Sequence, residues 1–332
     1  MENFKLLSQK NLLDNLQAFS SKKICAMVKS NAYGHGLDEI VKILDGKVSY
    51  FGVANVEEGV RVRRLTSSPI LVVGKVQDFK RCKRFDLEFM VDCETDLKNA
   101  IAFNVSNQCH LKINCGMNRF GVNSELNMKI LDNILSDNGV VLKSVYTHFP
   151  NTQNRKQTCA SYQRFLALKS KLSQNPLVCF GGSEIAEYPF KFDMLRLGIG
   201  LYGYGKKELE PVMKIFSFVC ETMYVKSGEF IGYGQVYQVE HDGIFAVVPV
   251  GYGDGLQRRL GGRICVRING KKFPVVGDIC MDVFFARVDE TVKVGDVVEV
   301  MQDAEVFAKK LGTISYEVLT GFSNFRGVTK VE

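Results

Sequence analysis

The feature that most constrains the fold is an alternation of short β-branched runs with helix-like segments over the first 200 residues. Stretches with helical periodicity, such as 37–44 and 162–172, separate these runs. The predicted strands are residues 24–28, 50–54, 70–73, 87–91, 110–113, 142–147, 177–180 and 192–195. Strands that alternate with helices form parallel βα units, and eight such units predict a closed (β/α)8 barrel of the TIM type.

The competing architecture is an open, doubly wound parallel sheet. Such a sheet would place a phosphate-binding Gly-x-Gly-x-x-Gly turn directly after its first strand. Here the first predicted strand is followed by Lys29-Ser-Asn-Ala-Tyr-Gly-His-Gly, which is a different turn. The sequence therefore favours the barrel.

The pattern of hydrophobic and polar residues changes after about Tyr204. Segments of alternating hydrophobicity (230–237, 264–268 and 297–301) follow, with glycine-rich turns between them and one convincing short helix at about 304–311. This pattern is typical of a mostly antiparallel β domain. We place the boundary at the polar stretch 206–211, which gives a barrel over 1–205 and a β domain over 206–332. Within 1–19 we expect a short strand or coil and then a helix.

Composition narrows the function classes. The net charge is +7, but the basic clusters at 61–64 and 80–84 fall on predicted helices without interleaved aromatic residues, so we interpret them as solvated faces and expect no nucleic-acid partner. No apolar run approaches the roughly 20 residues of a membrane span, and the first residues lack a secretory signal pattern. We therefore expect a cytoplasmic protein without a membrane partner.

The ten cysteines and four histidines do not predict a metal site. The cysteines are scattered, no two form a Cys-x-x-Cys pair, and no cysteine and histidine cluster at ligand spacing. In a reducing compartment such thiols behave as small hydrophobic groups.

Lys29 is the first candidate for chemistry. It directly follows an apolar strand, and the carboxyl ends of barrel strands form the catalytic face of this fold. Desolvation at such a position lowers the pKa of an amine and makes it a nucleophile for Schiff-base chemistry. Tyr33 places a phenol close by. Position alone is equally compatible with an ordinary surface lysine.

The segment 26–36 resembles the cofactor-lysine segment of the alanine racemases, which use pyridoxal 5'-phosphate to interconvert L- and D-alanine. Further matches occur in the same order, at similar spacing, over almost the whole chain. They are residues 111–121, 146–149, 194–203, 249–255, 277–282 and 315–318. This collinearity makes a chance resemblance negligible.

The resemblance implies two proton carriers. Lys29 would hold the cofactor as an aldimine and, once free, exchange the α-proton on one face of the substrate. Tyr252 would serve the opposite face, because reprotonation from the original face only regenerates the starting enantiomer. A free phenol has a pKa of about 10, so a tyrosine base needs a neighbour that stabilises the phenolate, and the resemblance offers His148.

The remaining site residues are also implied by the resemblance. Arg196 would contact the pyridine nitrogen, and Arg119 the phenolic oxygen and the substrate carboxylate. Met281 and Asp282 would line the substrate entrance, and Lys112 corresponds to a lysine that is carbamylated in some family members. The cofactor phosphate would be bound by Tyr33, Ser183, Tyr316 and the backbone N–H groups of Gly198 and Ile199. Gly182 departs from the family pattern, which has asparagine before the serine.

The resemblance further implies a homodimer with shared active sites and, for a bacterial protein, supply of D-alanine to peptidoglycan. A broad-specificity racemase for serine, lysine or arginine stays open, because it would use the same two bases. A fold-type-III decarboxylase fits less well, since it pairs the ring nitrogen with an acidic residue instead of Arg196. A non-catalytic pyridoxal-phosphate carrier would lack the β domain.

Overall fold

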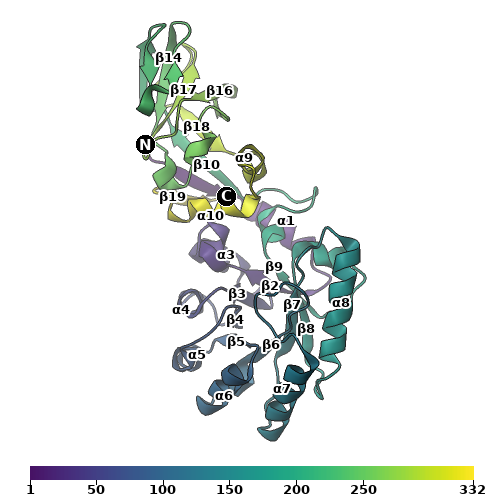
Figure 1. Cartoon of the computed structure of the whole chain (residues 1–332). Coiled ribbons are helices and arrows are strands. Elements are labelled where there is room, and N and C mark those ends of the chain that lie inside the picture. The colour runs from purple at the N-terminus through teal and green to yellow at the C-terminus, as the bar shows by residue number, and fades with distance from the viewer.

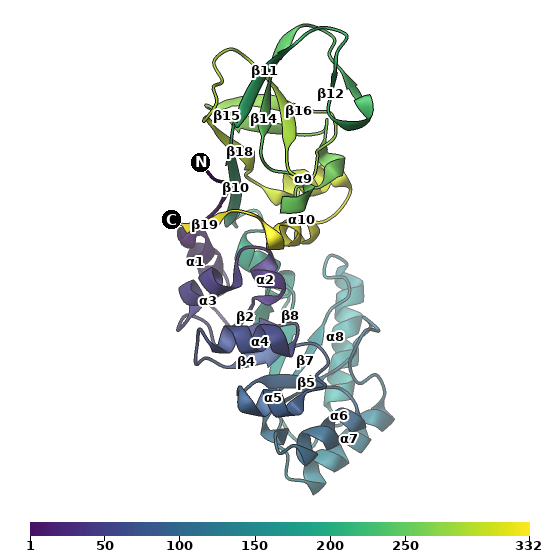
Figure 2. The ribbon, with the colours of Figure 1, turned by 90° about the vertical axis from the view of Figure 1, so that its left-hand side faces the viewer.

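The computed structural model describes all 332 residues. The chain forms two parts stacked end to end, a barrel and an elongated β domain (Figure 1). Seen from the side, α10 (Ser315–Gly321) of the β domain lies directly over α2 (Lys29–Tyr33) at the end of the barrel (Figure 2). This arrangement places part of the β domain over one mouth of the barrel.

The predicted closed barrel is confirmed. Its eight parallel strands are hydrogen-bonded in chain order, and β2 pairs with β9 to close the ring, with Cys25 opposite Arg196. The strands are β2 (Lys23–Met27), β3 (Tyr50–Val53), β4 (Ile70–Val72), β5 (Glu88–Val91), β6 (Cys109–Lys112), β7 (Ser144–His148), β8 (Leu177–Gly181) and β9 (Met194–Leu197). Each predicted strand has its counterpart, with ends shifted by at most two residues.

Helices surround the barrel, and most of them bury an apolar stripe against it. In α3 the buried residues Leu37, Ile40, Val41 and Leu44 recur at helical spacing. Polar caps begin several helices; the Asn55 side chain, for example, accepts a hydrogen bond from the first turn of α4. The helices are α1 (Gln9–Gln17), α2 (Lys29–Tyr33), α3 (Leu37–Leu44), α4 (Val56–Arg63), α5 (Phe79–Arg84), α6 (Glu94–Ala102), α7 (Glu125–Asp137) and α8 (Arg155–Lys169).

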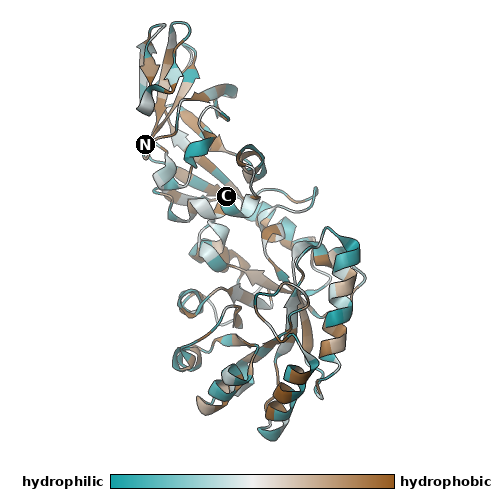
Figure 3. Cartoon of the chain, in the orientation of Figure 1, coloured by the Kyte–Doolittle hydropathy of each residue, from teal (hydrophilic) through white to brown (hydrophobic).

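Hydropathy follows this layering: the barrel strands are mostly hydrophobic, whereas the helices mix hydrophobic and hydrophilic residues (Figure 3). The two basic clusters lie on α4 and α5, as predicted. No helix combines the length and hydrophobicity needed to cross a membrane. All ten cysteines are free thiols.

The second part is a nine-stranded sheet in which every pairing except β1 with β19 is antiparallel, as the sequence predicted. Its order is β11-β14-β17-β16-β15-β18-β10-β1-β19, and β12 and β13 form a separate hairpin. The strands are β10 (Met213–Phe218), β11 (Glu221–Val225), β12 (Phe230–Ile231), β13 (Tyr237–Gln238), β14 (Gly243–Val248), β15 (Cys265–Ile268), β16 (Lys271–Val276), β17 (Phe284–Val288), β18 (Val297–Met301) and β19 (Val328–Val331).

Two features correct the sequence prediction. Strand β1 (Phe4–Leu7) is not part of the barrel half: it pairs with β10 and with β19 in the β-domain sheet. A second helix, α10 (Ser315–Gly321), follows the expected α9 (Ala304–Leu311). The expected short strand and helix within 1–19 are present as β1 and α1, but a four-residue strand does not show which sheet it joins. A seven-residue helix carries too little periodicity to be predicted.

Candidate active site

A cavity of about 700 Å³ opens at the carboxyl ends of the barrel strands and is lined in part by residues of α10. The barrel contributes side chains from the ends of several strands, and α10 contributes Tyr316. All the predicted cofactor residues line this cavity, together with Lys112: Lys29, Tyr33, Arg119, His148, Ser183, Arg196, Gly198, Ile199 and Tyr316. Groups that are up to about 290 positions apart in sequence thus face one space.

The segment after Lys29, labelled α2 in the figures, is a left-handed turn and not a regular α-helix. Four successive non-glycine residues, Ser30 to Tyr33, have φ between 52° and 54°, a conformation that costs roughly 1–2 kcal/mol per residue. The Ser30 N–H donates to Glu58 Oε1 at 2.6 Å, and Asn31 Nδ2 donates to the Ser323 carbonyl at 3.1 Å. Backbone strain that neighbouring groups must maintain is typical of a functional segment.

Lys29 lies where its amine can act as a nucleophile. Burial lowers the pKa of its ammonium, and the nearby positive charge of Arg119 lowers it further. A lowered pKa increases the neutral amine fraction at physiological pH, as both covalent attachment and proton transfer require.

Arg196 forms part of the cavity lining as a buried cation. Its Nη2 donates to the Thr147 carbonyl at 2.7 Å, and its Nη1 donates to the Cys179 carbonyl at 3.3 Å. The guanidinium lies 4.5 Å from the centre of the Tyr146 ring, which adds a cation–π contact. No carboxylate forms an ion pair with Arg196, so its charge is available to a ligand.

His148 lies beside Arg196 and is neutral. Burial and the Arg196 charge together lower the pKa of His148 to about 3. Gly181 makes this approach possible, because a Cβ there would lie 2.4 Å from Arg196 Nη2 and 2.6 Å from His148 Nδ1. A neutral imidazole can accept a proton or a hydrogen bond, whereas an imidazolium cannot.

The predicted phosphate ligands lie together. The rings of Tyr33 and Tyr316 are 5.9 Å apart, and Ser183 Oγ accepts a hydrogen bond from the Gly200 N–H at 2.9 Å. A Cβ on Gly198 would lie 2.7 Å from the Tyr33 hydroxyl, so glycine keeps this space open. Gly182, the departure from the family pattern, has φ of +112°, which suits glycine.

Lys112 and Arg119 also line the cavity. Burial and the charges of Arg196 and Arg119 lower the pKa of Lys112 to about 8. Its ammonium lies 5.1 Å from the centre of the Phe120 ring. The loop that carries Arg119 is tied to β5, because Asp92 accepts a hydrogen bond from the Gly121 N–H at 2.8 Å.

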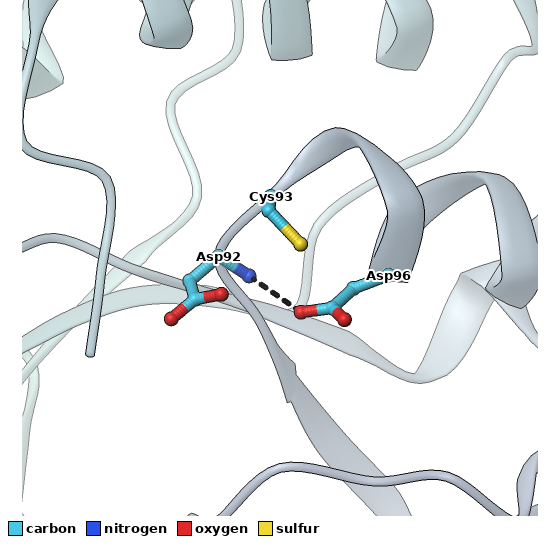
Figure 4. A group of neighbouring side chains, drawn as sticks. All are labelled: Asp92, Cys93 and Asp96. Atoms are coloured by element: carbon cyan, nitrogen blue, oxygen red, sulfur yellow. Dashed lines mark hydrogen bonds between the residues drawn. The ribbon is translucent and has the colours of Figure 1, made fainter.

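Asp92 also belongs to an acidic group with Cys93 and Asp96, drawn in Figure 4. The Asp92 N–H donates to the Asp96 carboxylate at 3.3 Å. The ammonium of Lys75 pairs with both carboxylates, so this group already has a cationic partner within the chain. We assign no metal to it.

Three predicted residues do not line the cavity of their own chain: Tyr252, Met281 and Asp282. They lie on neighbouring turns of the β domain, where the Tyr252 N–H donates to the Cys280 carbonyl at 3.0 Å. Tyr252 is 44% exposed and Met281 is 54% exposed. The structure therefore brings these residues to one another and presents them on the surface.

Arg326 holds these two turns together, and sequence reasoning missed it. Its Nε and Nη2 donate to the Asp254 carboxylate at 2.8 and 3.0 Å, and its Nη1 donates to Asp282 at 2.7 Å. Asp254 in turn accepts a hydrogen bond from the Gly251 N–H at 2.9 Å. The buried carboxylate two residues after Tyr252 was the only local signal for this clamp.

The charge of the cavity favours an anionic ligand. Its lining contains a single carboxylate, that of Glu317, but four basic side chains: Lys29, Lys112, Arg119 and Arg196. In a site partly shielded from water, cations without a partner attract a phosphate or a carboxylate strongly. The site can therefore bind an anionic molecule next to an activated amine.

Comparison with known proteins gives matches over both parts of the chain. The alanine racemase N-terminal domain family matches residues 8–206, and the alanine racemase C-terminal domain family matches residues 212–328. An alanine racemase from Leptospira interrogans is 30% identical over 96% of this chain and 92% of its own length.

Solved structures are similar throughout their length. The alanine racemase from E. faecalis superposes with a TM-score of 0.94 at 27% identity, covering 100% of this chain and 98% of its own. The enzyme from Bacillus anthracis with bound L-Ala-P has a TM-score of 0.87 at 27% identity, covering 97% and 93%. The Bartonella henselae enzyme, solved with covalently bound pyridoxal phosphate, shares the fold with a TM-score of 0.90 at 21% identity, covering 100% of each chain.

Proposed function

The chain belongs to the alanine racemase family, and we propose that it interconverts L- and D-alanine with pyridoxal 5'-phosphate bound in the barrel cavity. One observation carries this proposal: every residue predicted to hold the cofactor lines a single cationic cavity, with the amine of Lys29 in its wall. In a bacterial cell this activity would supply D-alanine for peptidoglycan.

The cavity fits the cofactor in size and charge. Its volume of about 700 Å³ lies in the range of small-molecule sites. Lys29 would hold the cofactor covalently, and Arg196 would donate a hydrogen bond to the ring nitrogen. Tyr33, Ser183, Tyr316 and the N–H groups of Gly198 and Ile199 would bind the phosphate. When bound, the cofactor supplies an electron-withdrawing ring that stabilises negative charge at the substrate α-carbon.

Arg196 directs the outcome of the reaction. Arginine donates a hydrogen bond without releasing its proton, so Arg196 would leave the ring nitrogen of a bound cofactor unprotonated. Arg196 would thereby keep the electron withdrawal by the ring moderate and any negative charge at the α-carbon short-lived. This favours reprotonation over decarboxylation or transamination.

Lys29 moves the α-proton on one face, and its lowered pKa raises the fraction of neutral amine that can accept that proton. Arg119 orients the substrate carboxylate. The second base, Tyr252, is exposed and lies outside the cavity of its own chain. A homodimer accounts for this position. In such a dimer, Tyr252 of the partner subunit enters the cavity, and the partner's Met281 and the partner's Asp282 line the substrate entrance.

This proposal divides the chain by role. Residues 8–205 form the cofactor domain, and residues 206–332 together with strand β1 form the domain that supplies the second base. A barrel that only carries the cofactor would not account for the match of the C-terminal domain family to residues 212–328.

The test is direct. The purified protein should take up pyridoxal 5'-phosphate, turn yellow and abolish the optical rotation of L-alanine. The Lys29→Ala variant should lack the yellow colour, and its turnover number should be lower by roughly 10⁴-fold. Assays with serine, lysine and arginine measure the breadth of specificity. Turnover of those amino acids but not of alanine would contradict the proposal in favour of a broad-specificity racemase.

A further inference from the structure

Lys5 places a buried ammonium at the junction of the two domains, although the chemistry above gives it no role. The residue lies in β1 and is 4% exposed. Lys5 forms no ion pair with a carboxylate; instead, Nζ donates to the Gly34 carbonyl at 2.9 Å and to the Phe322 carbonyl at 3.2 Å. A buried cation with no carboxylate in direct contact is costly, and these two hydrogen bonds offset part of that cost.

The two carbonyls terminate two segments that carry phosphate ligands. Gly34 ends the left-handed turn that contains Tyr33, and Phe322 directly follows α10, which contains Tyr316. The main chains touch here, since a Cβ on Gly34 would lie 2.0 Å from the Leu319 carbonyl oxygen. One ammonium therefore holds the ends of both segments.

Few other polar contacts join the same two segments. Asn31 Nδ2 donates to the Ser323 carbonyl at 3.1 Å, and Ser323 Oγ donates to the Ser30 carbonyl at 3.5 Å. Lys5 adds the only cationic donor, and it comes from a third element, the sheet of the β domain. Since left-handed backbone is intrinsically unfavourable for non-glycine residues, the turn depends on such external contacts.

We propose that Lys5 is a positioning residue for the cofactor phosphate: it holds the left-handed turn against α10 and thereby fixes Tyr33 beside Tyr316. Without the ammonium, the two carbonyls lose their shared donor and the turn can relax away from the helix. The consequence is weaker binding of pyridoxal 5'-phosphate. This inference rests on the proposed function, because it assigns the cofactor to the same cavity.

Lys5→Met tests the proposal, because methionine preserves most of the buried length and removes the ammonium. We expect the dissociation constant of pyridoxal 5'-phosphate, titrated by absorbance on the full-length apoprotein, to rise about tenfold. The kcat at saturating cofactor should stay near that of the unmodified protein, since Lys5 touches no reacting atom.

Lys22→Met is the matched control. Lys22 also donates to a backbone carbonyl, that of Phe192 at 3.1 Å, and lies 4.7 Å from the centre of that aromatic ring. It does not line the cavity. Its substitution should leave the affinity for the cofactor unchanged.

Lowered thermal stability of Lys5→Met with unchanged cofactor affinity would overturn the proposal, because Lys5 would then be merely structural. If that variant does not fold, Asn31→Ala removes another bond of the same junction, and unchanged affinity there would overturn it equally. An unmodified protein that fails to bind pyridoxal 5'-phosphate at all would instead refute the proposed function.

Discussion

The barrel and the β domain present their candidate catalytic groups in different environments. The barrel presents buried or half-buried groups with lowered pKa values, among them Lys29, Lys112 and His148. The β domain presents Tyr252 on an exposed turn that Arg326 ties to its neighbour. Under the proposed function, cofactor binding requires the barrel groups and Tyr316 of α10 but not Tyr252, whereas racemisation requires Tyr252 as well, so the two properties should be separable by substitution.

The largest separation is expected from Tyr252→Phe. This change removes the phenolic proton carrier and leaves the cavity lining intact, so the protein should bind the cofactor normally while turnover falls roughly 10²- to 10⁴-fold. Solvent-deuterium exchange into each enantiomer, followed by NMR, measures the two faces separately. Exchange should be lost unequally for L- and D-alanine; an equal loss would argue against one base per face.

A smaller loss of turnover is expected when Tyr252 is kept but its turn is held less firmly. Arg326→Leu removes the clamp between Asp254 and Asp282, so Tyr252 is present but less well oriented, and kcat should fall about tenfold or more. Cofactor affinity should not change. Arg267→Leu is the control, because Arg267 pairs with Glu299 elsewhere in the same sheet. Equal losses in the two variants would show that the effect is general destabilisation.

The smallest effect concerns the barrel wall. The pKa of Lys112 is lowered to about 8, so its neutral amine is more abundant at pH 7.5 than that of an ordinary lysine, and it becomes more abundant as pH rises. Neutral amines react with CO2, and we propose that Lys112 is carbamylated and that this anion orients Arg119. Removal of CO2 should raise KM for alanine a few-fold. The ¹³C NMR spectrum with labelled bicarbonate should show a carbamate signal that Lys112→Met lacks.

The sequence predicted the features that depend on contacts between residues close together in the chain, and it missed those that depend on contacts between distant residues. The barrel strands were predictable because each is a local β-branched run, and Lys29 was noticed because it directly follows one. The family resemblance then identified the residues that line the cavity. Their arrangement around a single space, lined in part by a helix of the other domain, is seen only in the structure.

The residues that hold the site together could not be predicted. Lys5 bonds to groups 29 and 317 positions away, and Arg326 to a carboxylate 72 positions away. Neither residue stands in a motif, and β1 gains its identity only from pairing with β10 and β19. Long-range hydrogen bonds leave no local pattern in a sequence. Positioning residues such as Lys5 and Arg326 can therefore be identified only from the structure.

The most direct test of the central claim, that one complete site needs halves from two chains, is to mix two inactive variants. Lys29→Ala lacks the barrel base and Tyr252→Phe lacks the β-domain base, but a mixed dimer would contain one site with both. After subunit exchange at equal concentrations, activity should return to about one quarter of the unmodified level, because about half of the dimers carry one intact site. A mixture no more active than the sum of its two separate variants would contradict the shared site.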